Sequence, residues 1–204
     1  MLFSNLYDLL VGIPAILIAL TFHEYAHGQV ANYLGDPTPG QQGRLTLNPL
    51  AHLDLLGTLM LVLFRFGWAK PVQINPMYFR NGYRVGTMMV GAAGPLANLL
   101  LAFIAAVALS LVGHGHLLLF RFLYYLVIYN LVLAVFNLIP LPPLDGSRIL
   151  AGVLPSRSLA AYYGIERYGP IILLALVFFG VIGYILNPLV NALWRLLTLA
   201  VGMA

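Results

Sequence analysis

Long uncharged blocks dominate the pattern of hydrophobic and polar positions along the chain. Residues 85–113, 122–144 and 168–194 contain no Asp, Glu, Lys or Arg. Each block reaches or exceeds the ~20 residues that an α-helix needs to cross a bilayer. Residues from about 9 to 34 predict a further helix, in which an apolar run over 9–22 precedes more polar turns. The pattern therefore predicts an all-α polytopic membrane protein with about five or six transmembrane helices.

Glycine and proline mark the expected ends of these helices. The Gly-Asp-Pro sequence at 35–37 ends the first helix, and three prolines within 140–143 break the span that begins near residue 117. Proline favours such breaks because it lacks an amide donor. An Asn-Pro pair separates a span over 168–186 from another over 189–201.

Between the first two long helices, the pattern predicts an element that associates with the membrane without crossing it upright. Residues 53–66 are apolar but short, so a half-membrane hairpin, a re-entrant segment and a tilted helix are all compatible with them. Residues 67–76 alternate apolar side chains between prolines, which indicates a short strand, and residues 44–47 are its candidate partner. We expect a short β-hairpin or a re-entrant segment here.

Composition supports a membrane protein and gives it an orientation. The 204 residues are 61% hydrophobic and 8% charged, whereas soluble domains carry roughly 25% charged residues. The net charge is +4, and the basic residues are scattered rather than grouped in a nucleic-acid-binding arm. Most of them fall within 44–84 or 148–167, and basic loops face the cytoplasm. We therefore expect a multi-pass protein of the cell membrane whose N-terminus lies outside and whose His23 region lies near the cytoplasmic side.

The N-terminal residues and the lack of cysteine bear on the predicted topology and on the possible metal ligands. No basic residue precedes the first apolar run, so we expect this run to remain as a helix rather than to be cleaved as a signal peptide. We expect residues 1–204 to form a single transmembrane domain, with a core over about 10–150 and additional spans over about 168–202. Cysteine is absent, which leaves only nitrogen and oxygen ligands for any metal.

One short sequence carries the clearest chemistry. Residues 23–27 read His-Glu-Tyr-Ala-His, an H-E-x-x-H pattern at the polar end of the first helix. Positions i and i+4 share a helix face, so both imidazoles can reach one ion. Glu24, beside the first ligand, can take a proton from a water molecule that the ion activates. Ionisable groups beside an apolar run are costly without partners, which makes a chance match a poor explanation.

A catalytic zinc usually has three protein ligands, so a third ligand must come from elsewhere in the chain. The candidates are His52, Asp54, His114, His116, Asp145 and Glu166. Asp145 is favoured because it follows the proline-broken span at the end that the orientation places level with His23. A helix N-cap is the alternative role for Asp145, and His52 or Asp54 could replace it as the ligand.

Two sequences together resemble the site-2 protease family of membrane-embedded zinc proteases, peptidase family M50. The first is H-E-x-x-H at 23–27, and the second is Asn-Leu-Ile-Pro-Leu-Pro-Pro-Leu-Asp-Gly at 137–146, which is similar to the family's N-x-x-P-x-x-P-x-D-G segment. Residues 91–98 also resemble the family's G-x-x-x-N region. The resemblance covers most of residues 15–150 and corresponds to a short form without PDZ or CBS modules. It implies that His23, His27 and Asp145 bind one Zn²⁺ per chain and that Glu24 is the general base.

Three further polar residues are weaker candidates. Asn98 and Asn137 lie inside apolar spans, where an amide either bridges helices or faces a polar cavity. Either amide could hydrogen-bond an oxyanion or the substrate backbone, and Asn137 is preferred. His52 could bind substrate or support the metal site, with a structural role slightly favoured. Asn130, on the same helix as Asn137, is interpreted as packing.

The hypothesis that follows is an intramembrane zinc metalloendopeptidase. Its substrates would be transmembrane segments of membrane proteins, as in regulated intramembrane proteolysis, and its surroundings the lipid bilayer. A divalent metal-ion transporter is the first alternative, although transporters usually place ligands at successive depths. A non-catalytic scaffold that binds membrane helices is the second.

Overall fold

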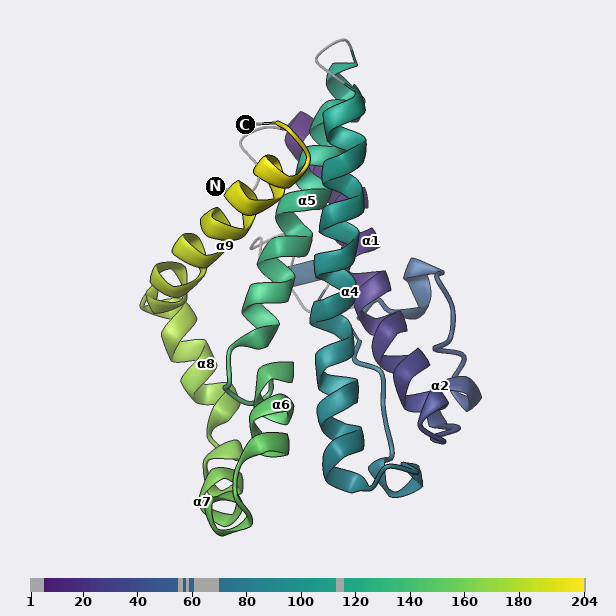
Figure 1. Cartoon of the computed structure of the whole chain (residues 1–204), viewed down its shortest axis with the longest axis vertical. Coiled ribbons are helices and arrows are strands. Elements are labelled where there is room, and N and C mark those ends of the chain that lie inside the picture. The colour runs from purple at the N-terminus through teal and green to yellow at the C-terminus, as the bar shows by residue number, and fades with distance from the viewer. Residues whose placement is uncertain (1–5, 55–56, 58, 61–69, 113–115, 204) are drawn as a thin grey trace.

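The computed structural model describes residues 6–54, 57, 59–60, 70–112 and 116–203, and within these residues the fold is helical (Figure 1). Ten elements follow one another in the described residues. They are α1 (Leu6–Tyr33), α2 (Thr38–Gln41), η1 (Pro49–Ala51), η2 (Pro76–Tyr78), α4 (Tyr83–Val112), α5 (Leu117–Leu138), α6 (Asp145–Val153), α7 (Ser156–Glu166), α8 (Gly169–Phe178) and α9 (Val181–Ala200).

Four of these helices, α1, α4, α5 and α9, are long and apolar enough to cross a membrane, and α8 is a shorter apolar helix. The four apolar helices confirm the expectation of a multi-pass membrane protein. The number of candidate spans in the described residues is lower than the five or six expected. Figure 1 shows the start of α1 and the end of α9 toward one end of the bundle, while α2, α6, α7 and the start of α4 lie toward the other end.

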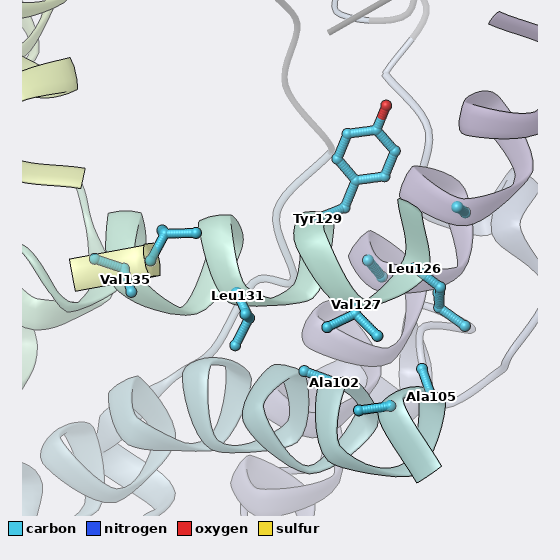
Figure 2. Close-up of a cluster of buried hydrophobic side chains, with 11 residues drawn as sticks. Ala102, Ala105, Leu126, Val127, Tyr129, Leu131 and Val135 are labelled. Atoms are coloured by element: carbon cyan, nitrogen blue, oxygen red, sulfur yellow. The ribbon is translucent and has the colours of Figure 1, made fainter. Parts of the chain in front are cut away.

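The core lies where α1, α4 and α5 pack together. Its buried side chains include Ala15 and Ala19 of α1, Ala102 and Ala105 of α4, and Leu131 of α5. Figure 2 shows the alanines of α4 facing the larger side chains of α5. In a bilayer, water does not drive helices together, so small residues that allow close van der Waals contact hold them instead. This three-helix core fixes the relative positions of the helices that carry the polar residues.

The C-terminal helices break at a different place from the one predicted. Asn187-Pro188 was expected to separate two spans, but Pro188 lies inside α9. The break comes at Gly180, whose φ of +72° lies in the left-handed region that glycine adopts without steric cost. The apolar residues 168–200 therefore divide into the short α8 and the longer α9.

The expected short hairpin between α1 and α4 is unconfirmed. Residues 44–47 and 70–75 are not strands in the structure. The amide of Val72 donates a hydrogen bond to the Glu24 carboxylate, and the amide of Asn75 donates one to the Asp36 carboxylate, so α1 and its C-terminal turn hold this segment. The re-entrant or tilted segment expected over 53–66, like residues 67–69 of the strand, falls largely outside the described residues.

Candidate metal centre

The helix α1 presents His23, Glu24 and His27 to the protein interior. All three side chains are buried, and the two imidazole rings meet edge to face with their centroids 4.6 Å apart. The two Nε2 atoms are 3.1 Å apart. The four-residue spacing thus brings both imidazoles to one point, as the helix period requires.

Asp145 completes this cluster from a position far along the chain. Its Oδ2 atom lies 3.1 Å from His23 Nε2 and 3.1 Å from His27 Nε2, so the three atoms form an equilateral triangle. Zinc with ligands at about 2.0–2.1 Å in tetrahedral geometry would separate each pair of ligands by about 3.3 Å. The triangle therefore has the size of one face of a zinc coordination tetrahedron, which leaves a fourth position open.

The alternatives for the third ligand do not join this cluster. Among the described residues, His23, His27 and Asp145 are the one group of three or more potential ligands close enough to hold a metal. His52 directs its Nε2 to the carbonyl of Thr46, and Asp54 accepts a hydrogen bond from the amide of Gly57. Asp145 is not an N-cap either, since Leu144 occupies that position and Asp145 begins α6. His114 lies outside the described residues.

A chain of hydrogen bonds fixes which nitrogen of His23 carries the proton. Asn130 donates its amide to the carbonyl of Leu126, so its Oδ1 is left to accept from Asn98 Nδ2, 2.7 Å away. The Nδ2 of Asn98 also donates to the carbonyl of Ala19, and its Oδ1 therefore faces His23 Nδ1 at 2.6 Å as an acceptor. His23 must then be protonated on Nδ1, which leaves the Nε2 lone pair free in the neutral ring.

A backbone carbonyl group orients the imidazole ring of His27 in the same way. Its Nδ1 lies 2.7 Å from the carbonyl oxygen of Val90 in α4, and a carbonyl can only accept. In their neutral form, both imidazoles thus direct Nε2 lone pairs at the Asp145 carboxylate. Three converging acceptors in a buried site need a cation between them. The two nitrogens and one carboxylate oxygen suit zinc, so the residues present fit this ion.

Two glycines near the site leave space that a larger side chain would fill. A Cβ on Gly94 would come within 2.5 Å of His23 Cε1 and would also strike the ring of His27. A Cβ on Gly146 would lie 2.5 Å from the carbonyl oxygen of Ile139, so this glycine lets α6 begin directly against the end of α5. That close approach delivers Asp145 to the two imidazoles of α1.

Two further contacts involve the acids of the site. The Oε2 atom of Glu24 accepts a hydrogen bond of 2.9 Å from the amide of Val72, which fixes one oxygen and leaves Oε1 outside that contact. The Arg148 Nη1 atom lies 3.7 Å from Asp145 Oδ1, the oxygen that is not directed at the histidines. A cation at this distance favours the ionised form of the carboxylate.

Comparison with known proteins agrees with this geometry. The model of peptidase family M50 matches residues 113–183. YwhC of Bacillus subtilis, named as a candidate zinc metalloprotease, is 41% identical over 185 residues, which cover 87% of this chain and 84% of YwhC. The chain belongs to peptidase family M50, the site-2 protease family.

More distant members of this family match in the same way. Rip2 of Mycobacterium tuberculosis is 30% identical over 84% of this chain and 71% of its own length. MJ0611 of Methanocaldococcus jannaschii is 28% identical over 69% of each chain. Both are also named as candidate zinc metalloproteases. No solved structure matches the chain at a significant level.

The G-x-x-x-N region of this M50 protein has a physical explanation in the structure. Gly94 leaves space for the two imidazoles, and the Oδ1 of Asn98, four residues later on α4, accepts a hydrogen bond from His23 Nδ1. Asn98 is fully buried and both of its amide hydrogens are engaged with Ala19 and Asn130. It bridges three helices, one of the two roles considered from the sequence, and has no hydrogen left to donate to an oxyanion.

The other weak candidates have hydrogen-bond partners outside the cluster. Asn137 donates to the carbonyl of Leu133 within α5. His52 is buried, with its Nδ1 unpartnered among the described residues. Sequence reasoning missed Asn130, whose place seven residues before Asn137 was interpreted as packing. It also missed the backbone groups of Val72 and Val90, which leave no signal in side-chain identity.

Proposed function

We propose that this chain cleaves transmembrane segments of membrane-protein substrates, with His23, His27 and Asp145 binding one zinc ion and Glu24 acting as the general base. Membership of peptidase family M50 makes the chain an intramembrane zinc metalloprotease. The observation that supports the residue roles is the triangle of potential ligand atoms from α1 and α6, each 3.1 Å from the next.

The chain's own groups account for the proton transfers that hydrolysis needs. Zinc, when bound, lowers the pKa of a water molecule to about 7 and polarises a carbonyl group. Glu24 lies one residue from the first ligand, where its carboxylate can take the proton of the attacking water and pass it to the departing amide nitrogen. The Val72 amide holds Oε2, so Oε1 is the oxygen available for this transfer. One oxygen thus positions the side chain while the other exchanges protons.

The buried asparagines act on the ligands rather than on the substrate. Asn130 and Asn98 keep the His23 proton on Nδ1, and the Val90 carbonyl does the same for His27. Partners of this kind orient metal ligands and raise their basicity. Asn137, at the end of α5 and eight residues before Asp145, is the remaining amide candidate for an oxyanion or substrate contact. His52 is a structural candidate, because its Nε2 secures the Thr46 carbonyl.

The substrate must present an extended backbone to reach this centre. Residues 70–75 run beside Glu24 without helical structure, and we propose that they pair with the unwound substrate segment in the manner of strand addition. The same segment is tied to α1 through Glu24 and to the turn after α1 through Asp36. A fixed edge next to the general base would align the scissile bond with it.

The active site is proposed to lie near the cytoplasmic side. The helices α2, α6 and α7 and the start of α4 lie toward one end of the molecule, and the start of α1 and the end of α9 lie toward the other (Figure 1). Most of the described basic residues belong either to the segment from the end of α1 through the first turn of α4, or to α6, α7 and the turn that follows α7: Arg44, Lys70, Arg80, Arg84, Arg148, Arg157 and Arg167. Loops rich in Lys and Arg face the cytoplasm. Residues of about 10–150 would then form the catalytic core, with α8 and α9 as additional C-terminal elements.

A reconstituted system tests this function. The zinc-loaded protein in liposomes is mixed with synthetic single-span peptides, and the products are identified by mass spectrometry. We expect internal cleavage by the parent protein and none by Glu24→Gln, which should retain its zinc because Glu24 is not a ligand. Cleavage at the parental rate by Glu24→Gln would refute the role of Glu24. Transport of zinc into the liposomes without hydrolysis would favour a transporter instead.

A further inference from the structure

A small cavity lies beside the metal centre, at the end of the molecule that carries α6 and α7. Its volume is about 200 Å³, and it lies between the start of α4, the helices α6 and α7, and the loop residues Ile74 and Pro76. The residues of the metal centre do not line it. It is therefore a separate site whose role the cluster of His23, His27 and Asp145 does not explain.

Several residues that line the cavity lie within two or three positions, along the chain, of residues that form or contact the proposed catalytic site. Ile74 follows Val72, whose amide binds Glu24, by two residues, and Ser147 follows Asp145 by two residues. Thr87 precedes Val90, the partner of His27, by three residues, or about 4.5 Å along α4. An extended peptide advances about 3.3 Å per residue. A substrate strand at the metal centre would thus reach the cavity within about two residues of its scissile bond.

Close packing makes these walls rigid. A Cβ on Gly91 of α4 would lie 3.0 Å from the Cβ of Arg148, and a Cβ on Gly152 of α6 would lie 2.6 Å from the Cβ of Met88. The two helices are therefore in direct backbone-to-side-chain contact at Met88 and Gly91, within four residues of Thr87. The hydroxyl of Tyr162 in α7 also donates to the carbonyl of Ser147 at 2.9 Å. A cavity framed this way can discriminate by shape and charge.

The charge of the lining is positive. Arg84 and Arg148 line it together with one carboxylate, that of Glu166, among the described residues. The Nε of Arg84 donates hydrogen bonds to the carbonyls of Ala151 and Gly152 at the end of α6. The Arg148 side chain is about a third exposed, and its Nη1 lies 3.7 Å from Asp145 Oδ1. A guanidinium carries five N–H donors, so Arg148 retains donors for a ligand.

The size of the cavity defines its ligand. Sites for drug-sized molecules and cofactors measure about 300–1,000 Å³, so about 200 Å³ suits one amino-acid side chain better than a nucleotide. We propose that the cavity is a substrate specificity subsite, which receives an acidic side chain about two residues from the scissile bond and recognises it through Arg148. This inference rests on the proposed proteolytic function and adds a substrate preference to it.

Charge reversal at Arg148 tests the subsite. A panel of synthetic single-span peptides carries Glu, Gln, Lys or Leu at each position near the cleavage point, and mass spectrometry gives the rate and site for each peptide. The parent protein should cleave a Glu peptide about tenfold faster than the Lys peptide at one fixed position, as expected for a close charge pair. Arg148→Glu should reverse this ratio, and Arg148→Gln should abolish it.

The controls separate recognition from damage to the metal centre. Zinc content is measured for each variant, because Arg148 approaches a proposed ligand, and Arg157→Glu on the exposed face of α7 serves as the matched charge reversal that should leave the ratio unchanged. Thr87→Trp, which fills the cavity from α4, should slow peptides with large residues at this position and spare those with Gly. If Arg148→Glu slows all peptides equally, the subsite is refuted while proteolysis stands. If the parent cleaves no peptide, the proposed function itself fails.

Discussion

Replacing Gly94 by alanine should damage the metal centre without removing any ligand. The added Cβ would lie 2.5 Å from His23 Cε1 and 2.7 Å from His23 Nδ1. Carbon atoms in contact normally stay about 3.5–4.0 Å apart, so the ring must retreat by roughly 1 Å. Metal–ligand distances tolerate changes of only about 0.2 Å. The displaced imidazole can then no longer bind in the triangle that it forms with His27 and Asp145.

The expected loss follows from what disturbed ligand orientation costs elsewhere. Disrupting the partners that orient a metal ligand lowers affinity about 10–100-fold, equivalent to about 1.4–2.7 kcal/mol. We expect the free zinc concentration for half-occupancy of Gly94→Ala to rise by at least this factor. Zinc per chain would be measured by elemental analysis after equilibration in buffers of fixed free zinc. Gly164→Ala is the matched control, since a Cβ there meets nothing within 4 Å. Parental affinity in a folded Gly94→Ala protein would refute the placement of the two imidazoles.

Three other substitutions test single contacts. Glu24→Gln should keep its zinc and lose at least about 10²-fold in cleavage rate, as loss of a general base does; a rate within twofold of the parent contradicts the assignment. Asn98→Leu removes the acceptor of the His23 proton and should weaken zinc binding about 10–100-fold, with Asn137→Leu as a control that leaves zinc binding intact; equal losses in both variants would count against the hydrogen-bond chain. Val72→Pro deletes the amide that holds Glu24 and should lower kcat with zinc content unchanged, whereas an unaltered kcat would show that this contact does not position the base.

The sequence predicted those parts of the site that depend on helix period and on side-chain chemistry. His23 and His27 share a helix face because they are four residues apart. Asp145 follows a proline-broken span, and this position predicted that it lies at the same membrane depth as the two histidines. The sequence alone could not separate His52 from the other ligand candidates, because the direction of its ring toward the Thr46 carbonyl depends on the tertiary structure. The meeting of α1 and α6 likewise depends on the glycines at 94 and 146, whose importance lies in the space around them.

Other features could not be predicted because backbone groups or tertiary contacts create them. The Val72 amide that binds Glu24 has no counterpart in residue identity, and it replaces the strand pairing that the alternation of residues suggested. The break in the C-terminal helices illustrates the same limit. Asn187-Pro188 is the stronger local signal, yet the helix continues through it and breaks at Gly180, where the chain adopts a positive φ. Asn130 was interpreted as packing because its link to His23 runs through Asn98.

Zinc stoichiometry tests the central claim most directly. The purified protein, its His23→Ala variant and its Asp145→Ala variant would be compared for zinc bound per chain at one buffered free zinc concentration. We expect about one ion per chain in the parent and a large loss in both variants, because each variant removes one of three protein ligands. Unchanged zinc content in Asp145→Ala would contradict the claim that α1 and α6 bind one cation between them.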